Sequence, residues 1–133
     1  MTGKELQCSI SGVQIVLPTG LANHLVFRVY RGPSQIAYAH LSRSSPGQRE
    51  RFSREHVSGP PTVSYCLKNI EVAQNYRGCG IGSALLDEVL NYCRAHRVSR
   101  IHGEAKGDVA ALKSWYQGKG FRVDARDEIL LSL

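Results

Sequence analysis

The sequence has no apolar run close to the roughly 18 residues that a membrane-spanning helix requires. Its first twelve residues, MTGKELQCSISG, lack the apolar stretch of a secretory signal. The four cysteines show no C-x-x-C spacing and no histidine pairs at zinc spacing. These absences argue against a membrane protein, a secreted disulfide scaffold and a metal site. They predict free thiols, no bound metal and a cytoplasmic location.

The composition is that of an ordinary globular domain. The 133 residues are 42% hydrophobic and 21% charged, which predicts a single domain over residues 1–133. The net charge of +6 is uneven, since residues 24–58 hold six arginines against two glutamates. A basic surface suits an anionic partner. Nucleic acid is disfavoured because the basic loop contains only Phe52 as a stacking side chain, and the sequence predicts neither a nucleic-acid nor a membrane partner.

Hydrophobic patterning predicts a mixed α/β domain around one sheet. Alternation and turn residues predict strands at 12–18, 24–32, 35–42, 62–72, 100–105, 121–123 and 128–133. An apolar stripe at spacing four predicts a helix from Ile81 to His96. A second helix follows Asp108 as its cap, with Ala111, Leu112 and Trp115 on its buried side, and ends at Gly118 and Gly120. Residues 43–61 read as a long loop, and loops of this length in compact domains tend to be functional or disordered.

The stretch NYRGCGIGSALL, residues 75–86, places three glycines between a strand and a helix. The first N–H groups of a helix have no internal partner and lie at the positive end of its dipole. Glycines let successive N–H groups converge on an anion, and Arg77 adds charge at the rim. No lysine follows the glycines as in a Walker loop, and Ser83 stands where a Rossmann fingerprint needs its last glycine. The pattern therefore indicates another phosphate loop or, alternatively, a turn built only for tight packing.

Two motifs in order resemble the GCN5-related N-acetyltransferase (GNAT) superfamily. The spacing Arg77-x-x-Gly80-x-Gly82 resembles its pyrophosphate loop. The block IHGEAKGDVAALKSWYQGKGF, residues 101–121, resembles a later block of the family that ends in Tyr116, Gly120 and Phe121. The resemblance covers about residues 62–133 and, more loosely, the N-terminal strands.

The resemblance implies a mixed, mostly antiparallel sheet that is splayed at a central V and flanked by helices. The two helices that the family places between its first two strands must be reduced or absent, because only about Pro18 to His24 is available. The acceptor site would then be open, or completed by the 43–61 loop or by a second subunit in a homodimer. Arginines of that loop would line the acceptor side or bind the CoA 3′-phosphate. Val109 stands where many relatives have an asparagine that touches the cofactor.

The resemblance also implies acetyl-CoA as the acetyl donor. The main chain at Ile70 and Val72 would pair with the pantetheine arm like an added strand. The N–H groups of the glycine loop would hold the pyrophosphate, from residues Arg77, Gly78, Cys79, Gly80, Ile81, Gly82 and Ser83. A helix N-terminus can activate a thiol, but direct transfer needs no cysteine nucleophile, so we interpret the Cys79 side chain as filler between glycines.

Four side chains are candidates for the chemistry, one of them a minor one. Tyr116 resembles the family's tyrosine that protonates the departing CoA thiolate, and a phenol matches an alkyl thiol closely in pKa. A backbone N–H near Val72 would stabilise the oxyanion. Glu104, twelve residues before Tyr116, resembles the glutamate that deprotonates the amine through water in peptide-acetylating members. Glu71 is the rival base, and alternation places it on the opposite face to Ile70. His102 shares the face of Glu104 and is a minor candidate.

The sequence therefore predicts an N-acetyltransferase that moves an acetyl group from acetyl-CoA to a primary amine of a peptide or small molecule. Transfer would be direct, through a tetrahedral intermediate. The alternative is a catalytically weak or silent acyl-CoA-binding regulatory domain of the same fold. The basic surface favours an acidic or neutral peptide, or a small molecule with a carboxylate, as the acceptor.

Overall fold

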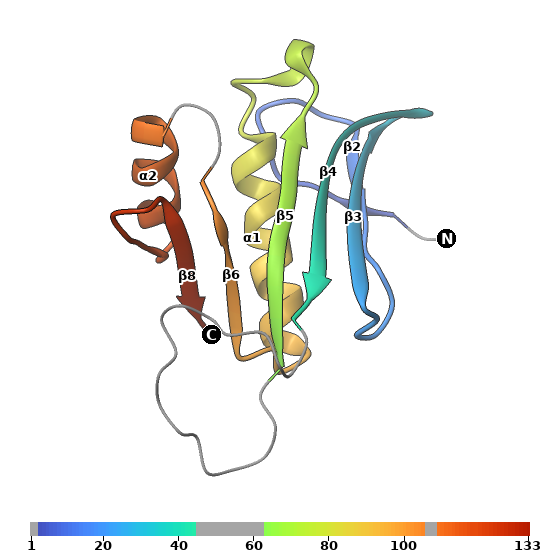
Figure 1. The fold of residues 1–133 in the computed structure, drawn as a ribbon. Coiled ribbons are helices and arrows are strands. Elements are labelled where there is room, and N and C mark those ends of the chain that lie inside the picture. The colour runs from blue at the N-terminus through green and yellow to red at the C-terminus, as the bar shows by residue number, and fades with distance from the viewer. Residues whose placement is uncertain (1–2, 45–62, 106–108) are drawn as a thin grey trace.

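The computed structural model describes residues 3–44, 63–105 and 109–133. In these residues one sheet runs in the order β1-β2-β3-β4-β5-β6-β8-β7 (Figure 1). The strands are β1 (Lys4–Glu5), β2 (Val13–Val16), β3 (His24–Arg31), β4 (Ser34–Arg43), β5 (Ser64–Val72), β6 (Arg100–Glu104), β7 (Arg122–Val123) and β8 (Glu128–Ser132). The helices are a 3-10 turn η1 (Gln74–Tyr76), α1 (Ile81–Ala95) and α2 (Val109–Gly118). The predicted mixed α/β class is confirmed.

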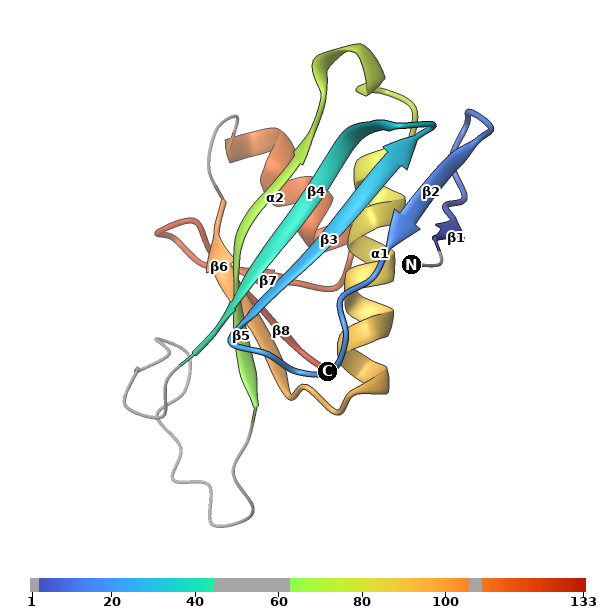
Figure 2. The same cartoon turned by 90° about the vertical axis from the view of Figure 1, so that its right-hand side faces the viewer.

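The sheet is antiparallel except between β5 and β6, which run parallel. A parallel pair needs a crossover, and α1 supplies it. The apolar stripe of α1 packs against β3, β4 and β5, and Figure 2 shows this helix along one face of that part of the sheet. The buried residues of α1 include the predicted stripe: Ile81, Leu85, Leu86, Val89, Leu90 and Cys93. Burial raises the pKa of the Cys93 thiol to about 12, so this thiol stays protonated in the core.

No helix interrupts the described residues between β2 and β3, as predicted from the short connection. Two core tyrosines hold this connection in place. The Tyr65 hydroxyl donates to the carbonyl of Ala22 at 2.6 Å, and the Tyr92 hydroxyl donates to the carbonyl of Gly20 at 2.5 Å. Each tyrosine thus buries its ring and satisfies its hydroxyl at the core boundary. Within the described chain, no helix covers the face of β3 and β4 that points away from α1 (Figure 2).

One expectation about α2 is wrong. Leu112 and Trp115 are half-buried, but Ala111 is exposed, and Tyr116 is the most deeply buried residue of this helix of those whose burial is described. Helix α2 packs against the short strand β7, and the side chains that contact α1 and Phe121 are Trp115 and Tyr116 in its second half. The sequence also gave no indication of β1 or η1. Asp108 and nearly all of the predicted 43–61 loop lie outside the described residues.

No helix in the described ranges is long and apolar enough to cross a lipid bilayer. None of the four cysteines, all of which lie in the described residues, forms a disulfide.

Candidate active site

Strands β5 and β6 are paired at one end and separate at the other. Their register runs from the pair Ser64 and Arg100 to the pair Leu67 and Gly103, and stops there. Strand β5 continues to Val72, paired only with β4 on its other side. The second half of β5 therefore has an edge without a strand partner, and Figure 1 shows β6 diverging from it. This is the predicted splayed V.

A β-bulge marks the point of separation. The register of β4 with β5 shifts between His40 and Leu41, which pair with Asn69 and Leu67, so Lys68 is the extra residue. Beyond the bulge the pairing is regular, and Ile70 and Val72 lie opposite the buried Ala39 and Ala37. A bulge increases local twist and bends a strand, which helps β5 to turn away from β6.

The side chains beyond the bulge alternate as predicted. Ile70 and Val72 are half-buried, whereas Glu71 between them is exposed. Glu71 lies opposite Tyr38 on β4. Burial raises the pKa of Tyr38, and the negative charge of Glu71 across the strand pair raises it further. Because the bulge falls at Lys68, it does not redirect Glu71, which stays on the face away from α1.

The glycine loop leads from β5 into α1 with the backbone that its sequence predicts. Gly78 and Gly80 have φ of 80° and 78°, values that favour glycine because a Cβ would be strained there. Gly80 caps α1, no side chain bonds the cap, and the first turn has no acidic residue. The first internal bond of the helix runs from the N–H of Ala84 to the carbonyl of Gly80 at 3.0 Å. The N–H groups of Ile81, Gly82 and Ser83 precede it and face out of the helix end.

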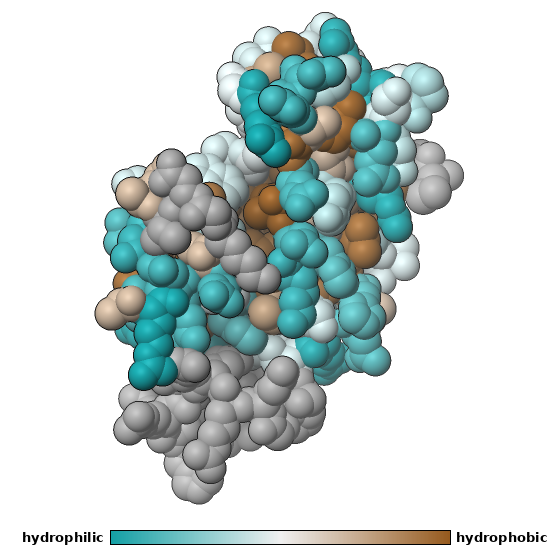
Figure 3. All heavy atoms as spheres, turned by 45° about the horizontal axis from the view of Figure 1, so that its top comes forward, coloured by the Kyte–Doolittle hydropathy of each residue, from teal (hydrophilic) through white to brown (hydrophobic). Residues whose placement is uncertain are grey.

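The third glycine serves another purpose. Gly82 lies in the first turn of α1 without a positive φ. A Cβ there would meet Val72 Cγ2 at 3.6 Å and Trp115 Cζ2 at 4.0 Å, which are ordinary contacts. Gly82 thus marks the place where the end of β5, the start of α1 and α2 come together. Figure 3, which brings this end of the molecule forward, shows apolar surface at its centre with hydrophilic residues around it.

Arg77 sits at the rim of the loop, as predicted, but one of its donors is already engaged. Its Nε donates to the carbonyl of Val72 at 3.1 Å. This bond holds the guanidinium against the end of β5 and leaves the terminal nitrogens as the remaining donors of an exposed side chain. The Val72 carbonyl therefore accepts one protein hydrogen bond before any ligand pairs with this strand.

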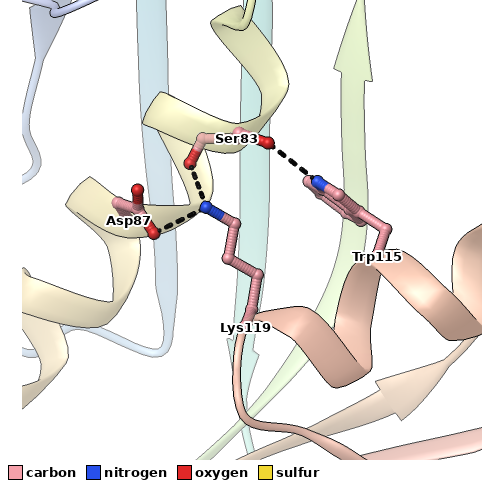
Figure 4. A network of polar contacts seen from close by, with 4 residues as sticks. All are labelled: Ser83, Asp87, Trp115 and Lys119. Carbon is pink, nitrogen blue, oxygen red and sulfur yellow. Dashed lines mark hydrogen bonds and ion pairs between the residues drawn. The ribbon is translucent and has the colours of Figure 1, made fainter.

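Helix α2 is bonded to the first turns of α1 through the polar network drawn in Figure 4. Trp115 Nε1 donates to the Ser83 hydroxyl oxygen at 2.9 Å. Lys119 Nζ donates to the Ser83 carbonyl at 3.3 Å and forms an ion pair with Asp87 at 2.9 Å. The sequence assigned a binding role to Ser83 only through its N–H, and no pattern in it pointed to Lys119. Since the indole N–H can only donate, the Ser83 hydroxyl accepts this bond and keeps its own proton as a donor.

Tyr116 is fixed by the way α2 ends. Gly120 has φ of 96°, and the N–H of Phe121 returns to the carbonyl of Tyr116 at 3.0 Å while that of Gly120 bonds Gln117 at 3.0 Å. This is a Schellman motif, in which a hydrophobic contact commonly accompanies the reversed chain. Here that contact is the Phe121 ring against the Tyr116 ring, with centroids 5.3 Å apart. The spacing Y-x-x-x-G-F is thereby explained by local structure, and burial raises the pKa of Tyr116.

The other two candidates lie on strand β6. Glu104 is the last residue of β6, just beyond the final pair with β5, and is exposed. It lies opposite Glu128 of β8. His102 is half-buried, and its Nε2 is 2.6 Å from the Ser44 hydroxyl. The described residues hold no group of three or more side chains suited to a metal ion.

A family model described as an acetyltransferase (GNAT) domain matches residues 22–123. The chain therefore belongs to the GNAT acetyltransferase family, as the two sequence motifs predicted. A comparison with individual curated proteins found no match to this sequence.

Solved structures of the family share the fold. A GNAT acetyltransferase from Elizabethkingia anophelis with acetyl-CoA bound is 15% identical, with a TM-score of 0.66, covering 93% of this chain and 100% of that one. Arabidopsis thaliana NAA60 with a bisubstrate analogue is 14% identical, with a TM-score of 0.67, covering 82% and 74%. The IAA acetyltransferase from Bacillus cereus is 19% identical, with a TM-score of 0.62, covering 84% and 79%. At these identities the likeness establishes the fold alone.

Proposed function

We propose that the protein is an N-acetyltransferase that transfers the acetyl group of acetyl-CoA directly to a primary amine. The observation that carries this proposal is the convergence, at one end of the sheet, of an open strand edge and a helix start that no side chain caps. The edge is the second half of β5, and the helix start follows Gly78 and Gly80. The two amides of pantetheine suit the edge, and the pyrophosphate suits the helix N-terminus. Acetyl-CoA carries both groups in one molecule.

The reaction requires the amine to lose a proton before it attacks the thioester carbonyl. The nitrogen then bonds to that carbon, the carbonyl electrons move onto oxygen, and the now positively charged nitrogen loses a second proton to solvent. Collapse of the intermediate expels the CoA thiolate and leaves the neutral amide. We assign the thiolate's proton to Tyr116, whose raised pKa keeps the phenol protonated at neutral pH. A backbone N–H near Val72 would stabilise the oxyanion.

For the base we favour Glu104 over Glu71. Glu104 ends β6 at the point where the two strands separate, which is where a thioester held along β5 would end. Glu71 lies farther along β5, opposite Tyr38. Replacing each by glutamine distinguishes them. Loss of the true base should lower kcat by about 10²-fold or more, whereas loss of the other glutamate should leave kcat nearly unchanged.

The uncovered face of β3 and β4 supports an acceptor site that is open rather than walled by helices. The four free cysteines are compatible with the cytoplasmic location that we propose. The alternative function, a regulatory domain that binds acyl-CoA without turnover, shares the cofactor site and differs only in the chemistry.

Two measurements test the proposal. Calorimetric titration with acetyl-CoA tests the cofactor, and binding in the micromolar range is expected. Thiol release from acetyl-CoA, measured across a panel of amines and peptides with free N-termini, tests turnover. Binding without release on any acceptor would favour the regulatory alternative, and absence of binding would overturn both functions.

Tyr116→Phe tests the proton donor. We expect kcat to fall by about 10²-fold with little change in acetyl-CoA affinity, whereas Tyr30→Phe, a half-buried tyrosine on β3, should leave both unchanged. The acid must be protonated to act, so its contribution is lost as pH rises through its pKa, which lies above the ordinary value of 10.0. A wild-type rate that falls steeply between pH 8 and 9 on the alkaline side would contradict this role.

A further inference from the structure

The hairpin between β1 and β2 contacts the glycine loop at one defined point. Ser9, at the tip of this hairpin, directs both its backbone N–H and its hydroxyl to the carbonyl oxygen of Cys79, each at 2.9 Å. Cys79 lies between Gly78 and Gly80, 70 residues away in the chain. Two donors thus converge on a single peptide group in the middle of the loop.

The geometry of the peptide group gives this contact its consequence. The carbonyl of Cys79 and the N–H of Gly80 belong to one planar trans unit, so they point in opposite directions. Fixing the carbonyl toward the hairpin therefore fixes the Gly80 N–H on the side away from it. In the described residues no carbonyl or side chain accepts a hydrogen bond from that N–H. It is left as a donor for a ligand.

The loop itself cannot impose this orientation. Glycine populates positive and negative φ about equally. The peptide group that joins Cys79 to Gly80 can therefore rotate at small cost when nothing holds it. The Cys79 side chain supplies no bond that would lock it in the structure. An external partner is needed to order the peptide before the ligand arrives, which reduces the conformational cost of binding.

The hairpin is suited to act as such a partner because it is anchored to the core. Leu6 is buried, and its N–H bonds the carbonyl of Val13 at 2.9 Å to close the base of the tip. The Cys8 thiol lies 3.3 Å from the carbonyl of Ile10, as a donor across the tip. Gly12, with φ of 76°, turns the chain back into β2. The tip is therefore a short, internally bonded turn.

We propose that Ser9 is a positioning residue that orients the Gly80 N–H toward the pyrophosphate of the cofactor. This inference rests on the proposed function, since it assumes that acetyl-CoA occupies the loop. The N-terminal hairpin would thereby contribute to cofactor affinity, although Ser9 itself would contact no part of the ligand. Cys79 then contributes through its carbonyl rather than through its thiol.

The test compares two ligands that differ in the pyrophosphate. Acetyl-CoA carries it, whereas S-acetylpantetheine has the same thioester arm without pyrophosphate or nucleotide. Ser9→Ala removes the hydroxyl donor, and Ser9→Pro removes both donors. We expect Ser9→Ala to raise the Kd for acetyl-CoA about three-fold to ten-fold, as for the loss of one hydrogen bond, and Ser9→Pro to raise it further. The Kd for S-acetylpantetheine, titrated to millimolar concentration, should not change.

Ser11 provides matched controls, because it is an exposed serine in the same tip without a hydrogen bond to the loop. Ser11→Ala and Ser11→Pro should leave both Kd values at the wild-type level. If the wild-type protein and both Ser9 variants bind acetyl-CoA with the same affinity, the role of Ser9 is overturned and the proposed function stands. Equal weakening of both ligands would also overturn it, since the effect would then be on the fold. A wild-type protein that binds no acetyl-CoA would overturn the proposed function itself.

Discussion

The two halves of strand β5 belong to one continuous strand but have different neighbours in the sheet. The first half, Ser64 to Leu67, lies between paired strands on both sides. The second half, Lys68 to Val72, is paired with β4 only. The first half contains two side chains buried in the hydrophobic core, Tyr65 and Leu67, whereas no residue of the second half is fully buried.

This difference shows how one strand can serve both stability and binding. The first half is paired with a strand on each side, which provides partners for the backbone groups of a buried strand. The second half has no strand partner on one side, where the Val72 carbonyl already accepts a hydrogen bond from Arg77. An open strand edge is an aggregation hazard unless something covers it. We interpret the pantetheine arm of acetyl-CoA as what covers it.

The largest effect is expected at Gly103, the last residue of β6 that pairs with β5. A Cβ there would lie 2.9 Å from the carbonyl oxygen of Leu67, which is backbone and cannot move aside cheaply. Gly103→Ala should therefore lower the free energy of unfolding by about 1–3 kcal/mol, as overpacking does. Urea denaturation measures it.

Gly118→Ala is the matched control for Gly103→Ala. Gly118 ends α2, its φ is not in the left-handed range, and nothing lies within 4 Å of an added Cβ. Alanine there should be neutral or stabilise by up to about 1 kcal/mol. Equal stability of the two variants would mean that β6 can move away from β5 at Gly103 without cost. The first half of β5 would then not be held more tightly than the second half.

The next effect distinguishes two glycines of the loop. Gly80→Ala places a Cβ on a residue with φ of 78°, which should cost about 1–2 kcal/mol of stability and weaken acetyl-CoA binding if the loop relaxes. Gly82→Ala adds only ordinary contacts and should leave stability within about 0.5 kcal/mol. Thermal unfolding with and without acetyl-CoA measures both, and a more damaging Gly82→Ala would refute the assignment.

Local patterns were sufficient to predict most elements of the fold. The stripe from Ile81 to Cys93 and the alternation along β3 and β4 each repeat one pattern over many residues, so both can be recognised in the sequence. Strand β1 has only two residues, Lys4 and Glu5, both exposed, and leaves no apolar pattern. The exposure of Ala111 followed from where α2 packs, which no local pattern of the helix contains.

The candidate site was predictable where its parts are close in sequence. The glycine loop and the Y-x-x-x-G-F block each encode a backbone geometry within a few residues, and the structure explains both. The bond of Trp115 to Ser83 spans 32 residues, and that of Ser9 to Cys79 spans 70. Serine is common on surfaces, so only the folded chain reveals that Ser9 meets the loop.

A smaller effect is expected from Trp115→Phe, which keeps an aromatic ring but removes the indole N–H bonded to Ser83. The loss should be about 0.5–1.5 kcal/mol of stability. Because Ser83 contributes a free N–H at the start of α1, we also expect acetyl-CoA affinity to fall by a few-fold. Unchanged affinity with reduced stability would mean that this bond supports the fold and not the proposed cofactor site.

The smallest effect is expected at Lys119, which shares the Ser83 network with Trp115 (Figure 4). Lys119→Met keeps most of the aliphatic chain and removes both the ion pair with Asp87, whose side chain is 57% exposed, and the long 3.3 Å hydrogen bond to the Ser83 carbonyl. Solvent screens such a pair, so the loss should be about 0.2–1 kcal/mol and should shrink further at 0.5 M salt. A loss above that of Trp115→Phe in the same urea titration would show that charge, rather than the indole hydrogen bond, holds α2 against the cofactor end of α1.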